Sequence, residues 1–157
     1  MPTVNSDPAW SLRPATTADL EPVAELRAEV MRPDLERLGR YDEHRVRQRL
    51  RDGFSPAHTS IVLLGPDRAF AGSVTVRPAD QGGRLLEHFY LHPRHQGQGL
   101  GTAVLRHLLA DADTAGEPVR LDVLQGSPAR RLYERHGFRL EREDEIDVFL
   151  LRPAPER

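Results

Sequence analysis

A glycine-rich stretch reads LHPRHQGQGLGT over residues 91–102, and it separates a predicted strand, 84–91, from a predicted helix that begins near residue 100. Its glycines alternate at positions 97, 99 and 101. Without a Cβ atom, such residues let the backbone turn sharply and direct several N–H groups at one place. The N-terminus of the following helix adds the positive end of the helix dipole. The stretch therefore predicts a binding site for an anion such as a pyrophosphate.

Three phosphate-binding motifs can be compared with this stretch. A P-loop requires a lysine before its Ser or Thr, but Thr102 follows a glycine, and all 22 basic residues of the chain are arginine. The dinucleotide fingerprint G-x-G-x-x-G requires a glycine at the same position and usually lies in the first strand–helix unit of a domain. What remains is either Q-x-x-G-x-G, which Gln96, Gly99 and Gly101 satisfy, or a glycine-rich turn that only begins a helix.

A second motif, SPARRLYERHGF, occupies residues 127–138 after a predicted strand at 119–124. Ser127 and Pro128 suit the N-cap and first position of a helix, and Gly137 suits its end. Tyr133 lies within this helix, either as a residue of an amphipathic core or as a functional phenol. A phenol with a pKa of about 10 is protonated at neutral pH and can give a proton to a leaving group.

The two motifs together resemble the signature of the GNAT superfamily of N-acetyltransferases, in which a Q-x-x-G-x-G loop precedes N-P-A-x-x-x-Y-x-x-x-G-F. Serine stands here in the asparagine position, and the resemblance extends over nearly the whole chain. It implies acetyl-coenzyme A as co-substrate, and direct transfer of its acetyl group to a primary amine of a small molecule or peptide. It implies coenzyme A contacts for Leu91, Gln96, Gly97, Gln98, Gly99, Leu100, Gly101, Thr102 and Ser127.

The resemblance also implies two catalytic residues. Tyr133 matches the phenol that protonates the leaving thiolate. Glu87 matches a position whose carboxylate deprotonates the attacking amine, directly or through water, although it could equally be a charge on a strand face. His88 and His92 are alternative bases, and strand alternation predicts His88 on the face opposite Glu87.

The remaining pattern predicts one α/β (α+β) domain over residues 1–157, with a loose tail at 1–9. A break is expected at 31–41, because this segment contains Pro33 and Gly39. The resemblance implies the GNAT fold, a twisted mixed sheet of about seven strands flanked by about four helices. Helices are expected at 20–30, 42–52, 100–115 and 128–136, and strands at 10–13, 61–64, 69–76, 84–91, 119–124, 138–142 and 146–151.

Composition narrows the classes of function. A net charge of −2 argues against a nucleic-acid partner, and the lack of cysteine excludes disulfides, thiolate metal sites and a cysteine nucleophile. The seven histidines are scattered without metal-ligand spacing, so no metal is expected. No apolar run approaches the ~20 residues of a membrane span, and the first residues lack a signal-peptide pattern. We therefore expect a cytoplasmic protein of bacterial origin without a membrane partner.

The acyl acceptor is left open by the sequence. The alternating arginines at 45–51 predict a solvated helix face. The resemblance implies that residues 31–44 wall the acceptor pocket, with Tyr41, Glu43 and His44 as candidates for contact, and it is compatible with a homodimer. Two other classes of function stay open, a non-catalytic acyl-coenzyme A-binding or regulatory domain on the same fold, and a nucleotide-binding α/β protein.

Overall fold

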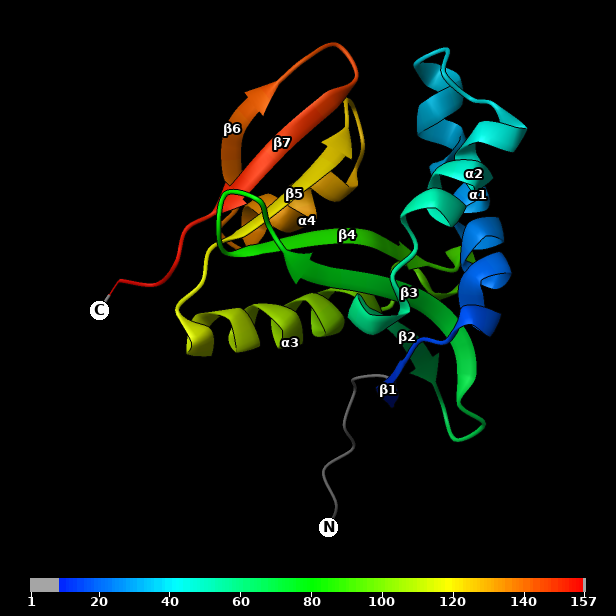
Figure 1. Cartoon of the computed structure of the whole chain (residues 1–157), viewed down its shortest axis with the longest axis horizontal. Helices are drawn as coiled ribbons and strands as arrows, with labels where there is room; N and C mark the ends of the chain where they lie inside the picture. The colour runs from blue at the N-terminus through cyan, green and yellow to red at the C-terminus, as the bar shows by residue number, and fades with distance from the viewer. Residues whose placement is uncertain (1–8, 157) are drawn as a thin grey trace.

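The structure is a computed structural model that describes residues 9–156, so most of the predicted tail lies outside the described residues. One seven-stranded sheet has the order β1-β2-β3-β4-β5-β7-β6 (Figure 1). The strands are β1 (Trp10–Pro14), β2 (Thr59–Leu64), β3 (Ala69–Pro78), β4 (Arg84–Leu91), β5 (Val119–Leu124), β6 (Arg139–Glu143) and β7 (Asp147–Arg152). The helices are α1 (Leu20–Arg37), α2 (Glu43–Gly53), α3 (Leu100–Ala115) and α4 (Ala129–Arg135). The predicted fold class and order of elements are confirmed.

The sheet opens between its two central strands. β4 and β5 are its parallel pair, and they pair only at Arg84 with Val119 and Leu85 with Arg120. Beyond Leu85, β4 stays paired with β3 while β5 stays paired with β7, so the two strands diverge (Figure 1). Backbone groups along the facing edges of the two strands are thereby left without a strand partner.

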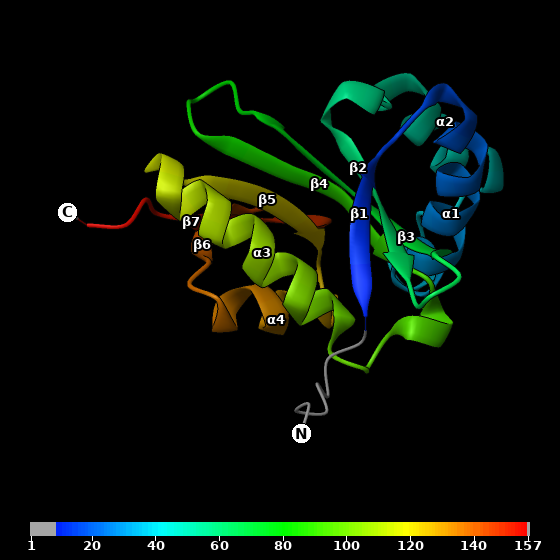
Figure 2. The same cartoon turned by 90° about the horizontal axis from the view of Figure 1, so that it is seen from below.

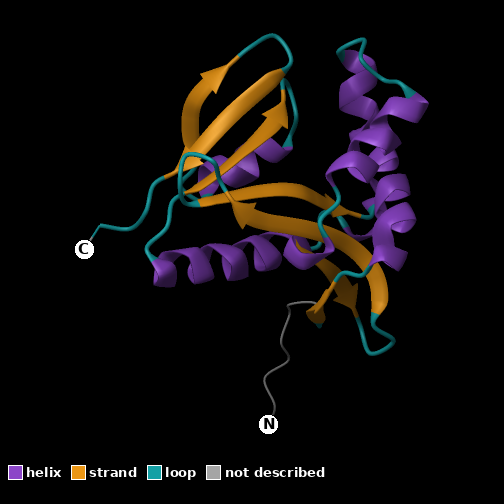
Figure 3. Cartoon of the chain, viewed as in Figure 1, coloured by secondary structure: helices purple, strands orange, loops and turns teal. Residues whose placement is uncertain are grey.

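Two apolar clusters lie on opposite faces of the sheet. One joins α3 and α4 to the sheet through residues such as Leu105 and Phe138. The other joins α1 and α2 to β2 and β4 through residues such as Leu50 and Tyr90. Figures 2 and 3 show the α1–α2 pair lying together at one side of the sheet, away from α3 and α4. The opening between β4 and β5 therefore has a different pair of helices on each side.

The predicted break from residue 31 is wrong, because α1 continues through Pro33 to Arg37. A proline inside a helix removes one hydrogen bond and costs roughly 3 kcal/mol. The apolar stripe of Val30 and Met31 still packs on the α1–α2 cluster, which favours helix over this segment. The helix ends at Arg37, and the predicted break begins only after it, where Gly39 has a φ of 69° that suits the residue following a helix C-terminus.

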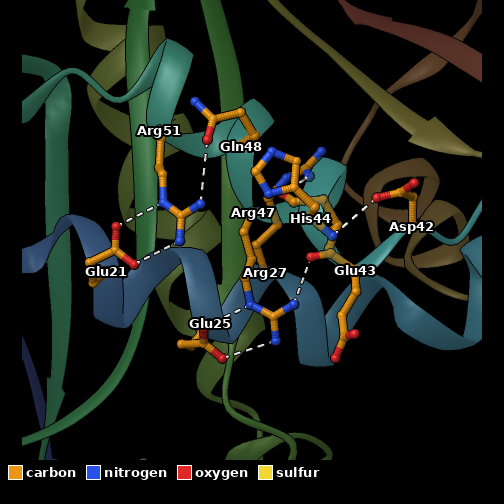
Figure 4. A network of polar contacts seen from close by, with 10 residues as sticks. Glu21, Glu25, Arg27, Asp42, Glu43, His44, Arg47, Gln48 and Arg51 are labelled. Atoms are coloured by element: carbon orange, nitrogen blue, oxygen red, sulfur yellow. Dashed lines mark hydrogen bonds and ion pairs between the residues drawn. The ribbon is translucent and has the colours of Figure 1, made fainter.

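Helix α2 begins after Asp42, whose carboxylate accepts hydrogen bonds from the amides of residues 44 and 45 at 3.0 and 2.8 Å. Two of its arginines bind α1 (Figure 4). Arg47 Nε lies 2.7 Å from Glu25 Oε1, and Arg51 Nε lies 2.8 Å from Glu21 Oε1. The predicted arginine face is therefore only partly exposed at these two residues, which also hold α2 against α1.

Candidate active site

A cleft of about 1150 Å³ opens where β4 and β5 diverge. Its walls come from α1, α2 and the loop between them, from β4, β5 and α4, and from the turn between β6 and β7. Three of the residues singled out in the sequence line it, namely Glu87, Ser127 and Tyr133. Segments distant in sequence thus meet at one opening.

Tyr133 reaches the cleft from α4. Its ring is buried, with an edge-to-face contact to Phe138 at a centroid distance of 5.6 Å. Its hydroxyl makes no hydrogen bond with residues 9–156. The hydroxyl is nevertheless not enclosed, since Arg77 Nε is the one side-chain polar atom of the described residues that is both enclosed and without a hydrogen-bond partner. Burial raises the pKa of the phenol, and Tyr90 and Asp122 raise it further. The group is therefore a protonated donor at neutral pH with no competing acceptor among the described residues.

Glu87 points from β4 to the face covered by α1 and α2. Its Oε1 lies 2.8 Å from Arg77 Nε, at an angle that makes an ion pair rather than an aligned hydrogen bond. Arg77 also donates from Nη2 to the carbonyl of Gly53 at 2.9 Å. The carboxylate is thus anchored beside α2 while remaining part of the cleft wall.

The predicted position of His88, on the face opposite Glu87, is wrong. The β3–β4 register passes from Ser73–Tyr90 to Thr75–Glu87, so β4 carries one extra residue here, and His88 has a φ of 50°. Such a β-bulge resets the alternation of side chains. The His88 ring consequently lies beside Glu87, with Nε2 3.8 Å from Oε1, and both residues line the cleft.

A polar chain runs from α1 to this histidine. Arg27 Nε donates to the Tyr90 hydroxyl at 3.0 Å, and that oxygen lies 3.1 Å from His88 Nδ1. Burial, together with the charges of Arg27 and Arg77, lowers the pKa of His88 to about 4, so the ring is neutral at neutral pH. If the Tyr90 proton points to Nδ1, the imidazole carries its own proton on Nε2, toward Glu87.

The other candidate base, His92, lies outside this cleft lining. Its Nε2 is 3.8 Å from Glu29 Oε2, and its Nδ1 accepts from the backbone amide of Arg94 at 3.3 Å. Among the three candidate bases, the structure places Glu87 and His88 together in the cleft.

The glycine loop follows β4 and leads into α3. Gly97 and Gly99 have φ values of 76° and 83°, which side chains rarely tolerate. The backbone amides of residues 97–102 donate to no acceptor among the described residues. Gln96 Nε2 donates to the Leu91 carbonyl at 3.0 Å and ties the loop to the end of β4. Unused amides at a helix N-terminus fit a phosphate group, although this loop does not line the large cleft.

Ser127 caps the first turn of α4 with its side chain. Its Oγ accepts a hydrogen bond from the amide of Ala129 at 3.3 Å, at the start of α4. The helix begins one residue later than predicted, with Pro128 before it. Ser127 therefore helps to set the direction in which α4 presents Tyr133.

The acceptor side of the cleft was only partly predicted. Tyr41 lines it, whereas Glu43 and His44 do not. Sequence reasoning missed Asp122 of β5 and Asp147 of β7, which line the opposite wall. Partial enclosure raises the pKa of both carboxyls, and the charge of Asp147 raises that of Asp122 further. The one signal for Asp122 in the sequence was its place as a polar residue among the alternating apolar residues of the strand at 119–124.

Two further features bear on the class of protein. Between residues 9 and 156, no group of three or more His, Asp or Glu side chains is arranged to hold a metal ion. Within that same range, no helix is both long and apolar enough to cross a bilayer.

Comparison with known proteins gives a consistent result. The family model described as the acetyltransferase (GNAT) family matches residues 21–138. The PaiA N-acetyltransferase of Thermoplasma acidophilum, solved in complex with coenzyme A, shares 19% identity with a TM-score of 0.72, covering 93% of this chain and 99% of that one. The ribosomal-protein-S18-alanine N-acetyltransferase of Escherichia coli shares 17% identity with a TM-score of 0.70, covering 95% and 96%.

A search of curated proteins gave no match. The two structural matches establish the shared fold, and the family model extends over both motifs described above, the glycine loop and the tyrosine helix. The chain belongs to the GNAT acetyltransferase family.

Proposed function

We propose that this protein transfers the acetyl group of acetyl-coenzyme A directly to a primary amine held in the cleft. One observation carries the proposal: Tyr133 and Glu87 line the same cleft at the point where β4 and β5 diverge. One is a protonated acid from α4, and the other is a carboxylate on the face covered by α1 and α2. Acyl transfer to an amine needs both kinds of group.

The residues of the chain fit coenzyme A. Six consecutive unused amides at 97–102, two glycines with positive φ and the N-terminus of α3 suit a pyrophosphate. The unpaired edge of β4 beyond Leu85 offers backbone groups to an extended arm. When bound, acetyl-coenzyme A would supply the activated thioester.

The proton transfers can be assigned to particular groups. An ammonium acceptor must lose a proton before its nitrogen can attack the carbonyl carbon, and Glu87, assisted by neutral His88, receives that proton directly or through water. As the new C–N bond forms and the C–S bond breaks, the nitrogen releases its second proton to water, and Tyr133 donates its own proton to the leaving sulfur and later regains one from solvent. The chain has no cysteine, so no cysteine acyl-enzyme can form.

Thiol release with acetyl-coenzyme A and a panel of amines tests this function. Tyr133→Phe should lower kcat by about 10²–10⁴-fold while calorimetry shows coenzyme A binding within a few-fold of wild type. Tyr41→Phe removes another phenol of the same cleft and serves as the comparison: as a candidate contact of the acceptor it can change KM for the amine, but kcat should stay near wild type. Coenzyme A binding without turnover of any amine would instead favour the non-catalytic binding domain.

A further inference from the structure

The arginines of α2 fall into two pairs with the same helical spacing. Arg47 and Arg51 bind the glutamates of α1, as described above. Arg45 and Arg49 point elsewhere: both are exposed, both line the cleft, and neither has a carboxylate within 4.0 Å among the described residues. Helix α2 therefore carries two arginines that are paired with carboxylates, and two that line the cleft without a carboxylate partner among the described residues.

Arg27 of α1 adds a third cation to this wall. Its side chain is buried, with the residue 8% exposed, and it bonds to two neutral acceptors, the Tyr90 hydroxyl and the Val46 carbonyl. Its Nη2 has no hydrogen bond within residues 9–156 and is not enclosed, and Arg27 is one of the residues that line the cleft. A guanidinium stays charged, and a buried one without a carboxylate leaves a positive potential unopposed.

The wall across the cleft carries the opposite charge. It contains Asp122 and Asp147, with Asp144 and Glu145 in the turn before β7. No ion pair within 4.0 Å joins this wall to Arg45 or Arg49 among the described residues, although the charge of Arg49 lowers the pKa of Asp147. The two charged walls thus face the same space and interact at a distance, without a contact ion pair from Arg45 or Arg49 among the described residues.

We propose that the acceptor is a zwitterion, an amino acid or short peptide whose amine lies near Glu87 and whose free carboxylate binds Arg45 and Arg49. The proposal rests on the proposed acetyl transfer. Guanidinium groups bind carboxylates through paired, charge-assisted hydrogen bonds, and a cationic wall disfavours a purely cationic acceptor such as a diamine. Arg27 adds a positive charge to the same wall and so contributes to attracting that carboxylate.

Matched acceptors test the carboxylate subsite. Glycine, diglycine and triglycine are compared with their C-terminal amides and with 1,4-diaminobutane, with kcat/KM measured by thiol release. At least one acid should exceed its amide by about tenfold or more, mainly through KM, as expected for a lost charge-assisted hydrogen bond. The double variant Arg45→Gln/Arg49→Gln should bring acid and amide to near parity.

The control is Arg47→Gln/Arg51→Gln, which removes the same charge from the same helix but on the side facing α1. It should keep the preference for the acid. Equal kcat/KM values for the acids and for the amides or the diamine would overturn the proposal. A preference for the acid that survives in the Arg45→Gln/Arg49→Gln variant would also overturn it. A higher kcat/KM for O-phosphoethanolamine than for every peptide would mean that the arginines bind a phosphate, and it would overturn the proposed carboxylate subsite.

A binding measurement separates failure of the subsite from failure of acetyl transfer. If no amine is turned over, N-acetylated diglycine and its amide are titrated calorimetrically into the full-length protein saturated with coenzyme A. Tighter binding of the acid, lost in the Arg45→Gln/Arg49→Gln variant, would support the subsite even though acetyl transfer had failed. Equal binding of the two, or no binding of either, would overturn it.

Discussion

The two sides of the opening between β4 and β5 offer different means of recognition to the ligands proposed for them. On the side of α3, the loop 97–102 presents backbone amides, held by positive-φ glycines and by one glutamine side chain at Gln96. On the side of α1 and α2, the cleft is surrounded by charged side chains from α1, α2, the loop between them, β4, β5, β7 and the turn before β7. Backbone recognition needs a short contiguous motif, whereas side-chain recognition draws single residues from across the chain. The first side suits a cofactor common to a family, and the second can differ from one protein to the next.

Of the four changes considered below, Glu87→Gln should have the largest effect, because it removes the carboxylate that receives the proton of the acceptor amine in the proposed reaction. We expect kcat/KM for acetyl transfer to fall by about 10²-fold or more, with coenzyme A affinity unchanged. Glu25→Gln is the matched control, since it also breaks a Glu–Arg pair but lies outside the cleft. Activity of Glu87→Gln within twofold of wild type would show that the residue only neutralises Arg77.

The acceptor side should also carry a pH dependence of stability. The pKa of His88 is about 4 in the folded chain against 6.5 for an ordinary histidine. Between these values the unfolded chain binds a proton that the folded chain does not, so the free energy of unfolding falls as pH drops from 6.5 to 4, by up to about 3 kcal/mol.

Urea unfolding of wild type and His88→Gln across this pH range measures that dependence. The variant should lack the part of the slope that His88 contributes. Parallel curves for the two proteins would mean that neither burial nor the charges of Arg27 and Arg77 lower the pKa of His88 in the folded chain.

The cofactor side should respond to backbone strain. Gly99→Ala places a Cβ on a residue with a φ of 83°, where no atom lies within 4 Å, so the cost is conformational, about 1–2 kcal/mol. Coenzyme A affinity should fall by about tenfold, because the amides at 97–102 lose their orientation. Gly65→Ala, with a φ of 78° and equally open space, should cost similar stability and leave the affinity unchanged. Equal coenzyme A affinity in both variants would argue against the loop as the pyrophosphate site.

The smallest effect should come from the ion pairs between α1 and α2. Arg51→Gln breaks a largely exposed pair and should lower the free energy of unfolding by less than about 1 kcal/mol. Arg45→Gln, which has no ion pair to lose among the described residues, should change it less still. Thermal unfolding in low and high salt compares the two, and a larger loss for Arg45→Gln would contradict the division of the helix into two pairs.

Sequence patterns predicted the local structure of the glycine loop and the tyrosine helix better than the lining of the cleft, for a physical reason. The glycines of 97–101 and the helix around Tyr133 depend on local backbone geometry, which local residue types encode. The position of His88 depended on a bulge that strand periodicity does not reveal, and α1 passed Pro33 because tertiary packing outweighed propensity. Arg45 and Arg47 have the same sequence environment, and only the contact with α1 distinguishes them.

The two-sided account is tested most directly by initial velocities measured while acetyl-coenzyme A and an accepted amine are varied together. If the two substrates occupy opposite sides of the opening at the same time, double-reciprocal plots should give intersecting lines, as expected for direct transfer in a ternary complex. Parallel lines, the pattern of a covalent acyl-enzyme intermediate, would contradict the account.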